Sequence, residues 1–135
     1  MLNLYSKGCE YAIRAITVVS RQESQDGFSV KAVCKKAQIP ESFTRKVFQM
    51  LVKDGLLTAR TGPGGCYRFA RDPKKITLLD LIYAVDGKQA FDKCVIKDHR
   101  CDCTKQCALH PLWAKAKAGM IKEFEESSIA ELMKS

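Results

Sequence analysis

One short segment, CVIKDHRCDCTKQCALHPLW, contains four of the chain's seven cysteines and both of its histidines. Thiolates and imidazoles are the ligands that zinc and iron–sulfur clusters prefer in proteins. Their concentration here indicates a metal or redox site. The candidate ligands in this segment are Cys94, Cys101, Cys103, Cys107 and His110.

The spacing of these cysteines bears on what they bind. Six residues separate Cys94 from Cys101, and five separate Cys101 from Cys107. The two-residue Cys-x-x-Cys knuckle that zinc ribbons normally use is absent. Thiolates this far apart can surround a group larger than one tetrahedral ion, so an iron–sulfur cluster is favoured over zinc, with reactive thiols as a third interpretation. We interpret the remaining cysteines as packing or surface residues: Cys9, Cys34 and Cys66.

Composition limits the class of protein. A chain of 135 residues forms one domain, or one domain with a helical extension. Its net charge of +8 is typical of a nucleic-acid binder. We see no secretory signal and no run of the roughly 20 apolar residues that span a bilayer. We therefore expect a cytoplasmic protein whose cysteines serve metal or redox chemistry instead of disulfides.

No pattern of residues predicts an enzyme. The sequence lacks a recognisable pair of nucleophile and base, and the Gly-Pro-Gly-Gly run is not a phosphate-loop signature. We therefore expect a binding protein.

Two short helices joined by a tight turn are predicted in the first half of the chain. Ser29 can cap a helix over VKAVCKKA, Pro40 ends the link after it, and a second helix over ESFTRKVFQMLVKD ends at Gly55. A longer helix precedes them, with its apolar stripe at Tyr11, Ala12, Ala15, Ile16 and Val19. This order of elements indicates a helix-turn-helix.

The second helix of this pair has two predicted faces. Its apolar face is predicted at Phe43, Val47, Met50 and Leu51. Its other face carries side chains that can bind base edges and phosphates, and an ordinary solvated face is the alternative. The predicted DNA contacts on this helix are Ser42, Thr44, Arg45, Lys46 and Gln49.

A hairpin is predicted directly after this helix. Leu56–Ala59 and Cys66–Ala70 read as strands around a Gly-Pro-Gly-Gly tip. Glycines let the backbone approach a phosphate closely, and arginines flank the tip. A hairpin in this position indicates a DNA-binding wing, with predicted contacts at Arg60, Thr61, Gly62, Gly64 and Gly65.

The second half of the chain is predicted to contain two more helices with the cysteine segment between them. Thr77 begins one helix and Gly87 closes it. From Leu109 a long helix presents an apolar stripe, which favours pairing in a two-fold dimer over packing on its own core. The stripe comprises Leu112, Trp113, Ala116, Met120, Ile121 and Phe124.

The expected architecture is mainly α with a small β-hairpin wing. We divide it into a winged helix-turn-helix domain (1–87), a cysteine-rich loop (88–108) and a dimerisation helix with the C-terminal segment (109–135).

Nearly the whole chain resembles a family of bacterial winged-helix transcription regulators, the Rrf2 family, typified by cluster-sensing IscR and nitric-oxide-sensing NsrR. The resemblance rests on SKGCEYAIRA, GPGGCYRFARDP, LLDLIYAVDG and three spaced cysteines followed by ALHPLW. It implies homodimers that bind two-fold DNA sites, with the long helix as the dimer seam. It also implies that Cys94, Cys101 and Cys107 are ligands of an iron–sulfur cluster with two or four irons.

The fourth ligand is left open by this resemblance. Glu10 matches an acidic ligand that the partner subunit donates in some members, and His110 matches a histidine ligand in others. We favour Glu10, with Cys103 or a small exogenous ligand as the remaining options. The chain departs from many members at Thr61, where they carry Arg, and at Cys66, where they carry Gly.

The sequence thus predicts a homodimeric DNA-binding regulator tuned by an iron–sulfur cluster that senses cluster status, nitric oxide or redox state. The alternatives are a regulator of the same fold that senses by thiol oxidation or partner binding, and a zinc-stabilised interaction module.

Overall fold

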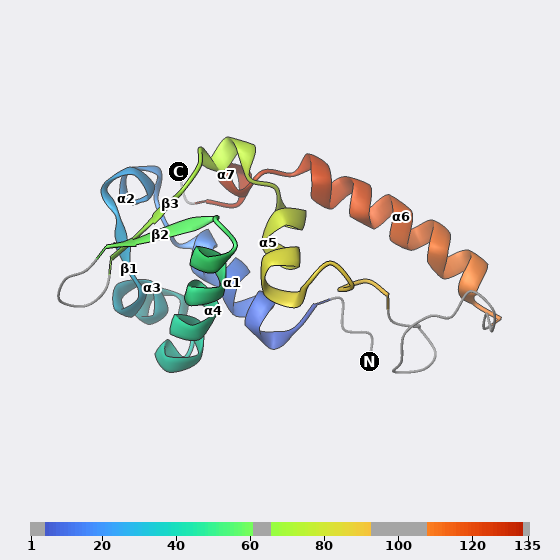
Figure 1. Ribbon diagram of the computed structural model, residues 1–135, viewed down its shortest axis with the longest axis horizontal. Helices are drawn as coiled ribbons and strands as arrows, with labels where there is room; N and C mark the ends of the chain where they lie inside the picture. The colour runs from blue at the N-terminus through green and yellow to red at the C-terminus, as the bar shows by residue number, and fades with distance from the viewer. Residues whose placement is uncertain (1–4, 61–65, 93–107, 134–135) are drawn as a thin grey trace.

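The structure is a computed structural model that describes residues 5–60, 66–92 and 108–133 (Figure 1). It is mainly helical, with one small sheet, as the sequence predicts. In chain order its elements are α1 (Lys7–Thr17), α2 (Arg21–Asp26), β1 (Phe28–Ser29), α3 (Val30–Ala37), α4 (Glu41–Lys53), β2 (Leu57–Arg60), β3 (Cys66–Phe69), the 3-10 turn η1 (Pro73–Lys75), α5 (Leu78–Asp86), α6 (His110–Glu126) and α7 (Ile129–Leu132).

Serine and threonine caps determine where several helices begin. The hydroxyls of Ser6, Ser20, Ser29 and Thr77 each accept a hydrogen bond from the amide three residues further on. Such caps satisfy amides that have no partner within the helix. The caps at positions 29 and 77 agree with the sequence prediction. The cap at Ser20 does not, because it starts a separate helix where one longer helix was expected.

The sheet has the strand order β1-β3-β2, and both pairings are antiparallel. Arg60 lies opposite Cys66, and Leu57 lies opposite Phe69. The predicted hairpin is therefore confirmed, with the first strand shifted by one residue. The two-residue strand β1 pairs with β3 through Phe28 and Tyr67, and the sequence did not predict it.

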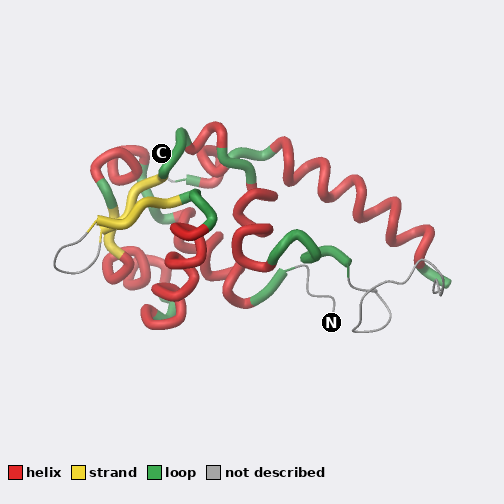
Figure 2. The backbone as a smooth tube through the Cα atoms, in the orientation of Figure 1, coloured by secondary structure: helices red, strands yellow, loops and turns green. Residues whose placement is uncertain are grey.

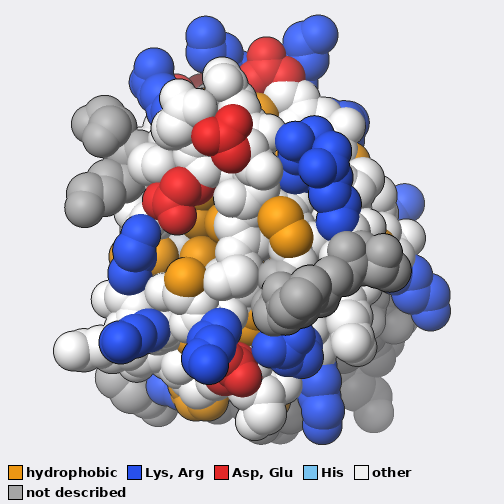
Figure 3. Space-filling view, turned by 90° about the vertical axis from the view of Figure 1, so that its left-hand side faces the viewer, with side chains coloured by type: hydrophobic (Ala, Val, Ile, Leu, Met, Phe, Trp, Pro, Cys, Tyr) orange, Lys and Arg blue, Asp and Glu red, His pale blue; other side chains and the backbone are white. Residues whose placement is uncertain are grey.

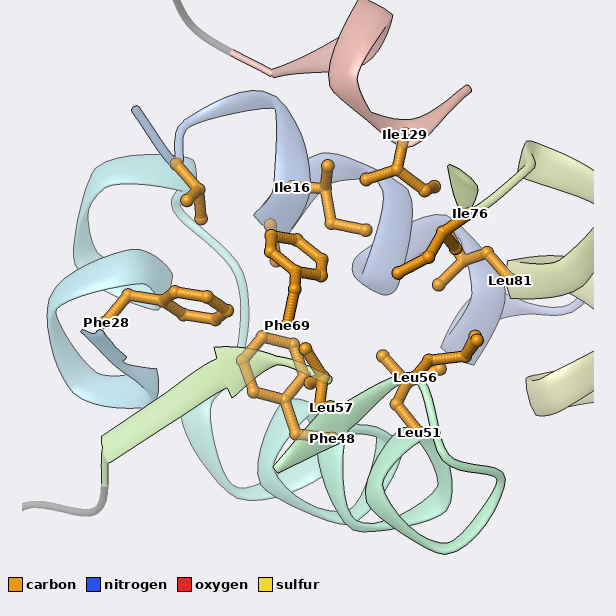
Figure 4. Close-up of a pocket in the computed structure, with 12 residues that line it drawn as sticks. Ile16, Phe28, Phe48, Leu51, Leu56, Leu57, Phe69, Ile76, Leu81 and Ile129 are labelled. Atoms are coloured by element: carbon orange, nitrogen blue, oxygen red, sulfur yellow. The ribbon is translucent and has the colours of Figure 1, made fainter. Parts of the chain in front are cut away.

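The core lies between the sheet and the helices α1, α3, α4, α5 and α7. Phe28 contacts both Phe48 and Phe69 through their rings. Figure 4 shows these side chains converging with Ile76 and Ile129 on one small cavity. Its volume is about 10 Å³, at the lower limit for a single water molecule, so this region is a packed interior and not a ligand site.

The link between α3 and α4 is a tight left-handed turn. Gln38 has a φ of 56°, and the amide of Ile39 donates to the carbonyl of Cys34. Pro40 then provides the residue before α4, where its fixed φ favours a helix start. The two helices therefore pack as the expected helix-turn-helix.

The long helix α6 lies at one end of the molecule, and none of its residues is fully buried (Figure 2). Its later turns pack against α5 through Met120, Ile121 and Phe124. The chain then returns to the core, because Ile129 is fully buried and its amide donates to the carbonyl of Ile76. The division into three segments stays a prediction. Among the described residues, no helix is both long and apolar enough to cross a membrane.

Candidate nucleic-acid interface and metal ligands

One face of α4 carries the exposed polar side chains that could contact DNA. Ser42, Lys46, Gln49 and Lys53 are exposed and recur at intervals of three or four residues, so they share one face of the helix. Arg45 is half-buried beside them, and its guanidinium lies 3.6 Å from the carboxylate of Glu41. A partly exposed ion pair of this kind contributes little, so it leaves Arg45 available to an external anion.

The predicted faces of α4 need a correction at three positions. Thr44, predicted to contact DNA, is fully buried, whereas Phe43 and Met50, predicted to be core residues, are 45% and 42% exposed. The helix buries Val47 and Leu51, as predicted, together with Thr44 and Phe48. Thr44 therefore cannot present its side chain to DNA.

Tertiary contacts explain this rotation of α4. Thr44 lies beside Cys34 of α3, where a small side chain fits between the two helices. The Phe43 ring lies edge-on against Tyr11 of α1, with 5.5 Å between the ring centres. Phe43 thus stands beside Ser42 and Lys46 on the outer surface. The sequence-based interpretation missed it, because a phenylalanine in a helix is normally a core residue.

The hairpin of β2 and β3 belongs to the sheet, which lies on the left-hand side of the molecule in Figure 1. Arg60 is exposed at the end of β2. The remaining predicted wing contacts, Thr61, Gly62, Gly64 and Gly65, lie outside the described residues. Seen from this side, Lys and Arg side chains gather over the lower part of the surface and again at its upper end (Figure 3). Such a distribution favours contact with a polyanion.

Some of the predicted cluster ligands lie among the residues that the structure describes, and the others lie outside them. Cys94, Cys101, Cys103 and Cys107 lie outside the described residues. Within the described ranges, no group of three or more ligand side chains could hold a metal ion. The structure therefore describes only the two candidates for the fourth ligand, Glu10 and His110.

His110 is the first residue of α6, and its Nδ1 atom is enclosed with no hydrogen-bond partner among the described residues. An enclosed imidazole nitrogen without a partner costs free energy, which a ligand bond would offset. Because His110 follows Cys107 by three residues, it fits the role of a ligand.

Glu10 lies in the first turn of α1, where its carboxylate forms an ion pair with Lys7 at 2.9 Å. Ser6, the cap of this helix, donates its amide hydrogen to Asp86 at 2.9 Å and thereby ties α1 to the end of α5. In Figure 1 the start of α6 lies far from α1. A single chain therefore does not bring Glu10 and His110 together.

Two of the cysteines outside the cysteine-rich loop, Cys9 and Cys34, are poor candidates for chemistry. Cys9 is fully buried, and burial, reinforced by the nearby Asp86, raises the pKa of its thiol to about 12. Burial also raises the pKa of Cys34. Neither thiol ionises readily at neutral pH, and the thiolate is the reactive form. Their interpretation as packing residues is confirmed, while Cys66 is half-exposed on β3.

Comparison with known proteins identifies the family. The model of the family Rrf2, described as "Iron-dependent Transcriptional regulator", matches residues 5–135. The chain is 30% identical to the HTH-type transcriptional regulator IscR of Vibrio campbellii over 98% of this chain and 78% of that protein. It is 23% identical to Protein rrf2 of Nitratidesulfovibrio vulgaris over 92% of this chain and 83% of that protein.

Solved structures agree on the fold. CymR, the global cysteine regulator of B. subtilis, superimposes with a TM-score of 0.74 at 19% identity, covering 98% of this chain and 96% of that one. IscR of T. potens gives a TM-score of 0.70 at 22% identity, covering 97% and 85%. These matches show a winged-helix fold, and the named sequence relatives are regulators and not enzymes. The chain therefore belongs to the Rrf2 family of DNA-binding transcriptional regulators.

Proposed function

We propose that the chain is a cytoplasmic homodimer that binds a two-fold DNA operator, with an affinity set by an iron–sulfur cluster on Cys94, Cys101 and Cys107. The main observation is that α4 presents Ser42, Arg45, Lys46 and Gln49 outward from a helix-turn-helix. Arg60 extends this surface toward the wing. Arginine, lysine and glutamine are the side chains that read base edges in the major groove and bind phosphates.

Residue substitution tests the DNA interface. Arg45→Ala should relax preference at one operator position and cost about 1–3 kcal/mol of specific binding, if Arg45 makes a bidentate base contact. Arg60→Ala should weaken specific and random DNA alike and reduce the salt slope by about one unit. Lys122→Ala on α6 is the control for loss of one charge. Parent-like titrations of both arginine variants with operator and random duplexes would contradict the assignment.

The homodimer is supported by the exposed start of α6. Leu109 and Leu112 are 41% and 69% exposed, whereas Met120, Ile121 and Phe124 pack against α5 of the same chain. The surface available for pairing is therefore narrower than the six-residue stripe that the sequence predicts. Exposed leucines at the start of a long helix favour burial against a second copy of the chain.

The cluster would supply a centre sensitive to nitric oxide or redox state. The chain's own residues would transmit its state, because the cysteine loop joins α5 to the start of α6. At its other end, α6 is tied to the DNA-binding part by a hydrogen bond of 2.9 Å from the Leu78 amide to the Ser127 carbonyl. A shift of α6 would therefore change how the two copies of α4 are spaced. A coupling of about 1–3 kcal/mol would be enough to change DNA affinity from severalfold to a hundredfold.

Anaerobic purification with iron and sulfide analysis tests the cluster. Replacing Cys94, Cys101 or Cys107 by Ser should bleach the protein, because a hydroxyl is a poorer iron ligand than a thiolate. Cys34→Ser and Cys66→Ser are matched controls, since both positions lie in the DNA-binding part, and they should stay brown. A colourless parent without sulfide would favour zinc or thiol sensing. Brown Cys107→Ser protein with full sulfide content would exclude that ligand.

The fourth ligand can be assigned by mixing chains. Cys107→Ala chains combined with Glu10→Ala chains regain one complete site per heterodimer if Glu10 acts across the dimer, so colour returns in part. If His110 of the same chain is the ligand, His110→Ala should lose or destabilise the cluster and Glu10→Ala should keep it. Colour in both single variants would move the assignment to Cys103.

Thiol sensing without a cluster is the second candidate function. The structure favours neither Cys9 nor Cys34 for it, because burial raises the pKa of both thiols. The half-exposed Cys66 and the cysteines of the cysteine-rich loop would carry such a response.

A further inference from the structure

A cavity of about 410 Å³, open to solvent on one side, lies between α2, η1 and α7. In Figure 1 these elements lie at the top, while α3 and α4 lie at the bottom, on the other side of the sheet. The volume lies within the range of small-molecule sites. Its lining comprises Arg21, Ser24 and Gln25 from α2, Phe69 from β3, Arg71, Asp72, Pro73 and Lys74 from the turn that follows, and Ala130 and Met133 from the α7 segment.

The charges around this cavity are unbalanced. Arg21, Arg71 and Lys74 contribute three cations, and none of them forms an ion pair with another described residue. Among the described residues of the lining, Asp72 is the one carboxylate, and it accepts the backbone amide hydrogen of Lys74 at 3.0 Å as the cap of η1. All three residues are exposed, and three cations along one pocket favour an anion there, above all where arginine can form paired hydrogen bonds.

Part of the remaining lining is apolar, beside the polar Ser24 and Gln25 of α2. Phe69 and Pro73 contribute from one side, and Ala130 and Met133 contribute from α7. A bare inorganic ion would leave these surfaces in contact with water. A molecule with an anionic head and an apolar body would satisfy the cations and cover the apolar side chains together.

We propose that this cavity binds a small organic anion, a carboxylate or phosphate ester with an apolar body. The site does not depend on the cluster or on the DNA interface. It lies where the segment after α6 returns to the core, since Ile129 donates to the carbonyl of Ile76 at 2.7 Å beside the cavity wall. An occupant would join α2 and η1 to α7, so it provides a second input to the end of α6.

The proposal predicts that affinity depends on the anionic group. Isothermal titration of the full chain should compare 1-naphthoate, 1-naphthyl phosphate and the uncharged 1-naphthalenemethanol. Both anions should bind at one site per chain, at least tenfold more tightly than the alcohol. The tighter of the two anions then identifies the preferred head group. Equal affinity for the alcohol, or no saturable binding of either anion, would overturn the proposal.

Substitutions locate the site. Arg71→Ala and Lys74→Ala should each weaken anion binding about tenfold, because each variant removes one hydrogen bond between charged groups. Ala130→Trp should abolish binding by filling the cavity. The neighbouring Lys75→Ala, which does not line it, should bind like the parent. Equal weakening in Lys75→Ala would reduce the effect to general charge and overturn the site. Operator binding without ligand should be unchanged in Lys74→Ala, so failure here is distinguishable from failure of the regulator function.

Discussion

The sheet-and-helix core and the long helix α6 bury their apolar side chains to very different degrees. In the core, Phe48 and Leu51 are each 1% exposed and fit against side chains from several elements. On α6, Leu112 is 69% exposed, and the residues that do pack are only partly covered. Each region contains apolar residues at helical spacing, so the pattern alone does not reveal this difference.

The difference indicates two sources of stability. The core can fold with its own contacts, because its interior is closely packed. Serine and threonine caps also stabilise the start of several of its helices. The exposed start of α6 needs another surface to bury its leucines. We expect substitutions in the core to change the free energy of unfolding at every protein concentration, and substitutions at the start of α6 to change it only through dimerisation.

The largest effect is expected from Phe48→Ala. This side chain contacts the rings of Phe28 and Tyr67, so its removal leaves a cavity and should lower the free energy of unfolding by about 3–5 kcal/mol. Leu112→Ala should change the unfolding of dilute protein by less than about 0.5 kcal/mol. Urea unfolding at several concentrations measures both.

Sedimentation provides the second half of this comparison. Leu112→Ala should move the dimer–monomer transition to higher protein concentration, and Phe48→Ala should not do so while it remains folded. A Leu112→Ala protein that dimerises like the parent would show that α6 is not the seam.

Glycine substitutions should give the next largest difference in unfolding free energy between the core and α6. Gly27 has a φ of 110°, and a Cβ atom there would lie 2.5 Å from the sulfur of Cys66. Gly27→Ala should therefore cost about 1–3 kcal/mol of unfolding free energy. On α6, a Cβ at Gly119 meets nothing within 4 Å, so Gly119→Ala should stabilise dilute protein by up to about 1 kcal/mol.

Two further variants separate strain from collision at Gly27. Gly55 also has a positive φ, of 83°, but has open space around it, so Gly55→Ala reports the backbone cost alone. Adding Cys66→Ala to Gly27→Ala removes the sulfur and should restore part of the loss. No recovery in the double variant would assign the whole effect to the backbone.

Much of the fold could be predicted because its signals are local. Ser29 and Thr77 cap helices where expected, and the hairpin follows α4 as its turn residues indicate. The short elements α2, β1 and α7 were missed, because two to six residues carry too little periodicity. The fragment SRQE does contain a capping box between Ser20 and Glu23 that marks the start of α2.

The candidate sites were harder to predict because they depend on tertiary contacts. Both Phe43 and Thr44 suit the inner face of α4 by spacing, and only the packing of α1 and α3 places Thr44 inside. The cavity between α2, η1 and α7 joins residues more than a hundred positions apart, such as Arg21 and Met133. No sequence pattern connects these residues.

A smaller effect is expected from the cap of α5. The Thr77 hydroxyl accepts the amide hydrogen of Asp80 at 3.0 Å, and the Asp80 carboxylate accepts the amide hydrogen of Thr77 at 3.0 Å. Thr77→Ala should cost about 1 kcal/mol of unfolding free energy, because it leaves an amide without its partner. Thr77→Ser keeps the hydroxyl and should cost much less. Equal losses in thermal unfolding would point to the methyl group instead of the cap.

The smallest effect is expected at the cap of α2, where it should depend on pH. The Ser20 amide donates to the carboxylate of Glu23 at 3.2 Å, and this bond is the main cause that lowers the pKa of Glu23 below its usual 4.5. A lowered pKa in the folded state stabilises the protein above the unfolded value of 4.5, and the gain is lost as the pH falls through the folded value.

Glu23→Gln should therefore cost about 0.5 kcal/mol near pH 7, since the side chain is partly exposed, and the cost should vanish in acid. Lys36 also contacts Glu23, at 3.5 Å, so Lys36→Ala distinguishes the two causes. With the backbone bond dominant, Lys36→Ala keeps most of the pH dependence of the unfolding free energy. If Lys36→Ala removes the pH dependence as fully as Glu23→Gln does, the ion pair is responsible. The stability contributed by the α2 cap then depends on salt as well as on pH.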